Sequence, residues 1–146
     1  MSWVFTSEGT GAGVHVFSDD HCPPHVHARH RAEGWVARVK FAYLGRSVEL
    51  LSIAPVRNIP LRRAVNRLLD DIEGELAAGR RSWWALRQTV CLANQWAVFQ
   101  ASGLIELASE TTKGAKQITE AVYRPEQDRL RATFRDGTTI NVSTGQ

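Results

Sequence analysis

The sequence contains one stretch that is dense in polar side chains, Asp19-Asp20-His21-Cys22-Pro23-Pro24-His25-Val26-His27-Ala28-Arg29-His30. Four of the five histidines of the chain lie within it. Two successive prolines cannot donate strand hydrogen bonds and also restrict the residue before them, so residues 19–24 are predicted to form a loop. Residues 25–29 can then form a strand that presents alternate side chains on one face. We expect the rest of the fold to hold this loop and strand in place.

Further strands are expected on both sides of this stretch. Residues 3–5 and 14–17 precede it, and residues 35–43 alternate apolar with mostly basic side chains after it. Another strand is predicted over residues 48–53. Short turns separate these segments, which favours an antiparallel meander.

The periodicity becomes helical after Pro55. Apolar residues at helical spacing predict a first helix from about Leu61 to Leu76. Ser82 is a suitable N-cap for a second helix, which is predicted to continue to about Gln100. The second helix would be apolar nearly all round, so we expect it to be buried.

The last part of the chain is predicted to be a small β unit. Residues 109–114 are small and polar, as in a linker. Three strands are expected after it, with a hairpin turn at Asp136-Gly137. The predicted fold class is therefore α+β, with an antiparallel sheet backed by two helices and a small C-terminal three-stranded β appendix. The predicted domains are residues 1–108 and 115–146.

Charge is distributed unevenly along a chain whose net charge is +3. Residues 29–67 contain nine basic residues and two acidic ones, so the part that attracts anions is expected in the first domain. There is no apolar run of about 20 residues, which predicts no membrane span and no membrane partner. Two cysteines and no signal-peptide pattern favour reduced thiols in a cytoplasmic protein.

Strand alternation predicts a histidine-bearing basic face on the first sheet. If the apolar residues of these strands face the helices, the polar ones share the opposite face. Glu49 joins that face if Val48 and Leu50 point inward. The predicted face contains His15, His25, His27, Arg29, Arg38 and Lys40.

A first interpretation of this face is a metal site. His25 and His27 are two residues apart on one strand, a spacing at which two imidazoles can share a divalent ion such as zinc. His21 is the candidate third ligand, and Asp19, Asp20 or Cys22 could add another. Positive charge from Arg29 and Lys40 would oppose ion binding, and no other cofactor is expected.

A second interpretation is acid–base chemistry on a phosphodiester. Histidine titrates near neutral pH, so His25 or His27 could act as acid or base, with Glu49 as the catalytic carboxylate. A third interpretation is a binding surface without catalysis, which would use His15, Arg29, Arg38, Lys40, Arg62 and Arg63 to hold nucleic acid or a protein partner. The histidines could also be merely exposed.

Two segments resemble known families. The stretch from Ser18 to Ala28 resembles the signature of a bacterial family of unknown function, an acid-His-x-Pro-Pro-His-x-His pattern before strands and helices, over roughly residues 3–87. The tail from Ile118 to Val142, with its Phe-x-Asp-Gly turn, resembles a second small β family of unknown function. Genes of the two families often lie together and are described as candidate toxin–antitoxin pairs, which implies that context for this chain.

Together these patterns predict a toxin–antitoxin-like binding module that engages nucleic acid or a protein partner through its basic sheet face. The alternatives are a small ribonuclease that uses His25 or His27, and an inhibitor protein that targets a nucleic-acid enzyme.

Overall fold

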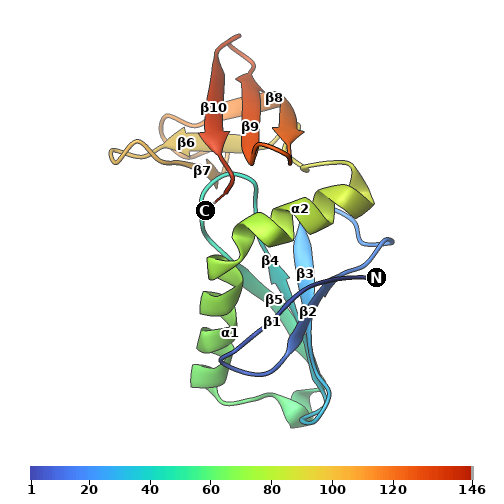
Figure 1. Ribbon diagram of the computed structural model, residues 1–146. Helices are drawn as coiled ribbons and strands as arrows, with labels where there is room; N and C mark the ends of the chain where they lie inside the picture. The colour runs from blue at the N-terminus through green and yellow to red at the C-terminus, as the bar shows by residue number, and fades with distance from the viewer. Residues whose placement is uncertain (146) are drawn as a thin grey trace.

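A computed structural model describes residues 1–145 and contains two five-stranded antiparallel sheets and two α-helices. The predicted α+β class is confirmed. Helix α2 lies between the two sheets, and α1 runs along the first sheet (Figure 1). Within the described chain, no helix is long and apolar enough to cross a membrane.

The first sheet is the predicted meander. Its strands follow each other in the order β1-β2-β3-β4-β5, and every neighbouring pair is antiparallel. Strands β2 and β4 alternate fully buried apolar residues with less buried ones. The bounds are β1 Ser2–Thr6, β2 Gly13–Val16, β3 His25–His30, β4 Trp35–Lys40 and β5 Glu49–Ala54.

The inner face of this sheet forms the core together with the helices. A short 3₁₀ helix, η1 (Val56–Asn58), precedes α1 (Arg62–Gly74) and α2 (Leu76–Arg87). The alternation predicted from the sequence is confirmed, since the apolar side of β2, β3 and β4 is buried. This core contains Val14, Val16, Val26, Ala28, Trp35, Ala37 and Val39 from the strands, and Leu68, Ile72, Leu76 and Trp83 from the helices.

The predicted length of the second helix is wrong. Helix α2 ends at Arg87, and Gln88 adopts a left-handed backbone conformation with φ of 53°, which stops the helix. The residues after it form a loop and then strand β6 (Trp96–Phe99). Apolar residues are dense in both elements, so periodicity alone could not separate helix from strand.

The second sheet is larger than the predicted three-stranded appendix. It has the order β10-β9-β8-β6-β7, with the hairpin β6–β7 adding two strands beside β8. The boundary predicted between residues 108 and 115 therefore falls inside this sheet. The remaining strands are β7 Ile105–Ala108, β8 Lys116–Arg124, β9 Arg129–Phe134 and β10 Thr139–Ser143.

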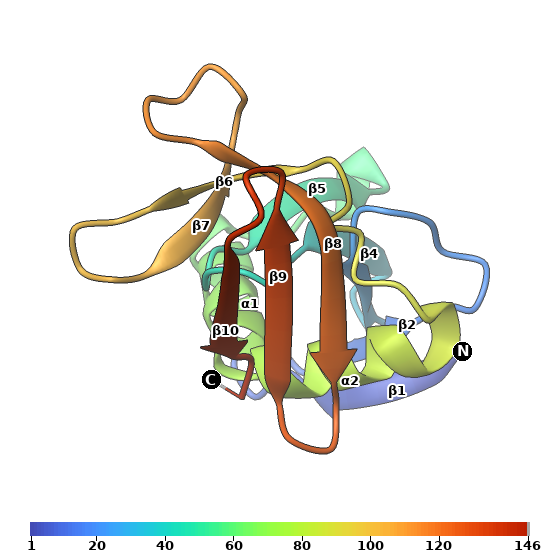
Figure 2. The same cartoon turned by 90° about the horizontal axis from the view of Figure 1, so that it is seen from above.

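The second sheet packs on α2, as the view from above shows for β8, β9 and β10 (Figure 2). The ring of Tyr123 in β8 contacts Trp84 of α2 and Tyr43, which follows β4. The ring centroids lie 5.7 Å apart for Trp84 and 5.0 Å apart for Tyr43. Arg80 is 2 % exposed, and its guanidinium donates to three backbone carbonyls from both halves of the chain. These acceptors are the carbonyl oxygens of Ala42, Gly45 and Thr144.

Candidate functional site

The proline-containing loop before β3 is closed by its own hydrogen bonds. The backbone N–H of Phe17 donates to Oδ2 of Asp20 at 3.0 Å, and Asp20 N–H donates back to the carbonyl of Phe17. The N–H of Phe41 donates to the carbonyl of Pro24 on the other side. As a result the Asp20 carboxylate lies beside the start of β3 and is only 9 % exposed.

A disulfide between Cys22 and Cys91 ties this loop to the segment that follows α2. The prediction of reduced thiols is therefore wrong. The two residues are 69 apart in sequence, and their Cα atoms lie 5.8 Å apart. Cys22 cannot supply a thiolate to a metal in this state. The disulfide also removes the observation on which the cytoplasmic expectation partly depended.

Asp20, His25 and His27 form a compact cluster. Oδ1 of Asp20 lies 3.4 Å from Nε2 of His25 and 3.1 Å from Nε2 of His27. One potential ligand atom from each residue lies within 4.8 Å of the other two, so the group could hold a metal ion. The two imidazole rings have centroids 5.3 Å apart.

His25 is not on an open surface, and this part of the prediction is wrong. Its ring is 4 % exposed and lies against Trp83 of α2, with centroids 5.5 Å apart. It is at the start of β3, where α2 crosses the end of the sheet, so alternation alone does not make it accessible. His27, two residues on, is partly exposed and contacts the edge of Phe17.

The other residues predicted for metal binding or catalysis lie outside this cluster. His21 is exposed, and its ring centroid is 6.5 Å from that of His25. Glu49 is exposed on β5, where it pairs with Lys40 of β4, Nζ to Oε2 at 3.2 Å. Its carboxylate is therefore engaged by a lysine rather than by a histidine.

One row of side chains crosses the outer face of the first sheet. Strand register pairs Trp3 with His15, His15 with His27, and His27 with Arg38. Directly paired residues lie on the same face, so these four side chains share one surface. Trp3 is 61 % exposed, which places a solvent-accessible aromatic ring beside the predicted basic residues.

Positive charge acts on the middle of this row. Burial lowers the pKa of the His15 imidazole below its usual value, and the guanidinium groups of Arg29 and Arg31 lower it further, followed by His27. Nδ1 of His15 is buried and lacks a hydrogen-bond partner among residues 1–145. The imidazole is thus held in a positive local potential that disfavours its own protonation.

Arg29 and Arg38 are exposed on the outer face, and neither forms an ion pair with a carboxylate in the described chain. Lys40, which belongs to the same predicted set, is neutralised by Glu49. Arg29 and Arg31 also line a shallow hollow at the end of the β3–β4 hairpin, together with Val36. The outer face therefore carries free positive charge.

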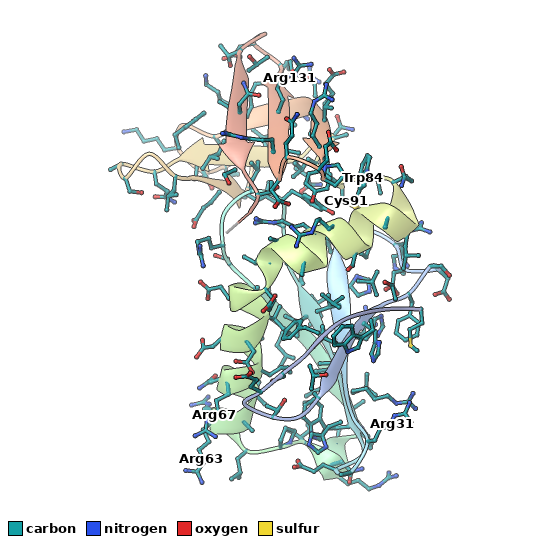
Figure 3. All side chains as sticks on the ribbon, viewed as in Figure 1. Arg31, Arg63, Arg67, Trp84, Cys91 and Arg131 are labelled. Carbon is teal, nitrogen blue, oxygen red and sulfur yellow. A yellow bond between two sulfur atoms is a disulfide. The ribbon has the colours of Figure 1, made fainter. Side chains whose placement is uncertain are left out.

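Arg62 and Arg63 do not join this face. They are exposed in the first turn of α1. Figure 3 shows Arg63 and Arg67 beside α1, on the opposite side of the molecule from Arg31. The predicted binding residues thus divide between the outer sheet face and the start of α1.

Trp3 was missing from the predicted site, and Asp20 was named only as one of several alternatives. Trp3 could have been found by extending the strand pairing from His27 through His15 to the first strand. Asp20 was only one of three candidate additional ligands, because a sequence does not show which side of a proline loop faces the next strand.

No protein family model, curated protein or solved structure matches the chain.

Proposed function

We propose that this protein is a nucleic-acid-binding module that holds single-stranded segments on the outer face of its first sheet. The observation that carries the proposal is the row Trp3–His15–His27–Arg38, flanked by Arg29. It combines an exposed aromatic ring with arginines that have no carboxylate partner in the described residues. The resemblance to families described as candidate toxin–antitoxin pairs agrees with such a module.

The arginines supply the affinity for the backbone. A phosphate that approaches Arg29 or Arg38 meets no competing protein carboxylate, so each contact releases a counterion from the nucleic acid. The guanidinium group also matches phosphate in a bidentate geometry. Binding through this face should therefore weaken steeply as salt is added.

Trp3 favours single strands over duplexes. Bases of a duplex are stacked on each other and do not offer a free face to an aromatic side chain, whereas an unpaired base does. Stacking on one aromatic ring contributes about 1–3 kcal/mol per base. Trp3 lies on the edge strand β1, where a strand of nucleic acid crossing from Arg38 would reach it.

Fluorescence anisotropy with labelled single-stranded RNA and DNA, and with a duplex, tests the proposal. The full chain should bind single strands, with an affinity that falls as salt rises. Arg38→Ala should flatten the salt slope by roughly one unit. Trp3→Ala should lose about 5- to 150-fold in affinity for single strands, and Trp3→Phe should recover part of this loss.

Arg63→Ala is the matched control, because Arg63 is also exposed but lies on α1. It should leave binding unchanged. Equal losses for Arg38→Ala and Arg63→Ala would refute the assignment to the outer face. Absence of binding even at low salt would remove nucleic acid and favour a protein partner, as for an inhibitor of a nucleic-acid enzyme.

The contact between His27 and Asp20 favours a second candidate, a small ribonuclease. A carboxylate that orients an imidazole is a common arrangement for a general acid or base, and His27 is more accessible than His25. Glu49 is less suited to this role because it pairs with Lys40. If the protein cleaves RNA, His27→Gln should reduce turnover by about a hundredfold or more while binding persists; intact RNA after prolonged incubation would exclude this activity.

A further inference from the structure

We propose that Asp20, His25 and His27 form a binding site for one divalent transition-metal ion such as zinc. The assigned ligand atoms are Oδ1 of Asp20 and the Nε2 atoms of both histidines. This set replaces the predicted set of His21, His25 and His27. It does not depend on nucleic-acid binding by the outer face.

The hydrogen bond of His25 fixes the proton on its ring. Nδ1 lies 2.8 Å from the carbonyl oxygen of Pro23, and a carbonyl can only accept, so Nδ1 carries the hydrogen. In the neutral ring the lone pair is then on Nε2. That atom faces Oδ1 of Asp20 at 3.4 Å, and a carboxylate oxygen is also an acceptor.

Two acceptors at this distance repel each other unless positive charge lies between them. A metal ion between them would bind both atoms. Such an ion uses both lone pairs and the negative charge of Asp20, and it leaves the Nδ1 hydrogen bond intact.

Two of the three distances between ligand atoms are close to those of such a site. Zinc binds imidazole nitrogen and carboxylate oxygen at about 2.0–2.2 Å, so ligands in a tetrahedral site lie about 3.3–3.6 Å apart. Asp20 Oδ1 lies 3.4 Å from one histidine nitrogen and 3.1 Å from the other. All three ligand atoms lie within 4.8 Å of one another.

The surroundings have the outer hydrogen bonds that metal ligands usually make. The carbonyl of Pro23 orients His25, and the backbone N–H of Phe17 donates to the second oxygen of Asp20 at 3.0 Å. Lys40, which was expected to repel an ion, is neutralised by Glu49. Water can complete the coordination beside His27, the most exposed of the three ligands.

Two imidazoles and one carboxylate select the class of ion. Hard cations such as Mg²⁺ prefer oxygen ligands only, whereas zinc, nickel and cobalt accept imidazole readily. The full chain, stripped of metal with its disulfide intact, should thus bind one Zn²⁺ per chain and melt at a higher temperature when zinc is present. The same concentration of Mg²⁺ should have no effect.

Nuclear magnetic resonance of the histidine rings identifies the ligands without any variant. Zinc should shift the ring resonances of His25 and His27 and leave that of His30 in place, since His30 lies at the far end of β3. Unchanged His25 and His27 resonances at saturating zinc would overturn the proposal, even if metal bound elsewhere on the chain.

Variants provide the second measurement, by calorimetric titration with zinc. Asp20→Asn and His27→Gln should each weaken zinc binding by on the order of a hundredfold or more, since loss of an outer-shell partner alone costs 10- to 100-fold. The matched control is His21→Ala, which removes the neighbouring exposed histidine and should keep the affinity. Equal losses in His21→Ala and His27→Gln, or unchanged binding in Asp20→Asn and His27→Gln, would refute the assigned ligand set.

Discussion

The protonation of His15 depends on its burial and on the positive charge of the outer face. Its pKa is lowered in the folded chain by burial and by Arg29 and Arg31. The unfolded chain therefore binds a proton at this position before the folded chain does as the pH falls below about 6.5. The contribution of His15 to the free energy of unfolding is fully present above that pH. It decreases as the pH falls toward the lowered pKa of the folded state.

Thermal melting of the wild type and of His15→Gln tests this prediction at about pH 7.5 and pH 5.5, on either side of the usual histidine pKa. The melting temperature of the wild type should fall more on acidification than that of the variant. The other histidines are common to both proteins, so the difference between the two falls reports on His15. An identical fall in both proteins would show that His15 does not carry this pH dependence.

At the same scale, the sequence could predict which side chains share a face but not which of them are covered. Period-2 alternation placed His27 and Arg38 on one face, and the strand register agrees. It could not show that Trp83 lies over His25, because that contact depends on where α2 crosses the sheet. Nor could it pair Cys22 with Cys91, since two cysteines 69 residues apart carry no local signal.

At the scale of elements, local turn chemistry was more informative than apolar density. The Asp136-Gly137 turn was predicted and does join β9 to β10, with Gly137 at φ of 87°, a conformation that favours glycine. The segment after Ser82 was misassigned, because Trp96 to Phe99 is apolar on both faces of a strand that lies between β7 and β8. A run that is apolar at every position fits a buried helix and a buried strand equally well.

The pairing of β6 with β8 leads to a prediction about truncation. A chain that ends at Gly114 keeps the β6–β7 hairpin but loses β8, β9 and β10, so β6 becomes an edge strand with unpaired backbone groups. It also uncovers Trp84 and Tyr43, which Tyr123 contacts in the full chain. We expect the truncated protein to aggregate.

Size-exclusion chromatography of the truncated and full chains, at equal concentration and with the disulfide intact, measures this outcome. The full chain should elute as a defined species and the truncated chain as large assemblies. A truncated chain that elutes as a single small species, with the melting temperature of the full protein, would show that the second sheet is dispensable for the first half.

At the scale of the whole molecule, polar contacts and one disulfide join the two halves, which are the first sheet with its helices and the second sheet with the segment that leads into it. Arg80 is a buried cation that is satisfied by carbonyls from both halves, and burial lowers its pKa to about 10, so it remains charged at neutral pH. The Arg81 guanidinium also reaches Asp128 at 2.8 Å, on the surface. The covalent link is the Cys22–Cys91 disulfide, which connects the candidate site to the segment that enters the second sheet.

Reduction of this disulfide should destabilise the whole chain. It closes a loop of 69 residues, and releasing a loop of that length gives the unfolded chain back about 4 kcal/mol of conformational freedom on the loop-entropy model. Urea denaturation of the oxidised and reduced protein should give midpoints that differ accordingly. The double variant Cys22→Ser/Cys91→Ser should have the midpoint of the reduced protein both with and without reductant, because its serines cannot form a disulfide. Equal midpoints for the oxidised and reduced wild type would contradict a stabilising disulfide, whereas a difference that persists in the double variant would assign the effect to the reductant.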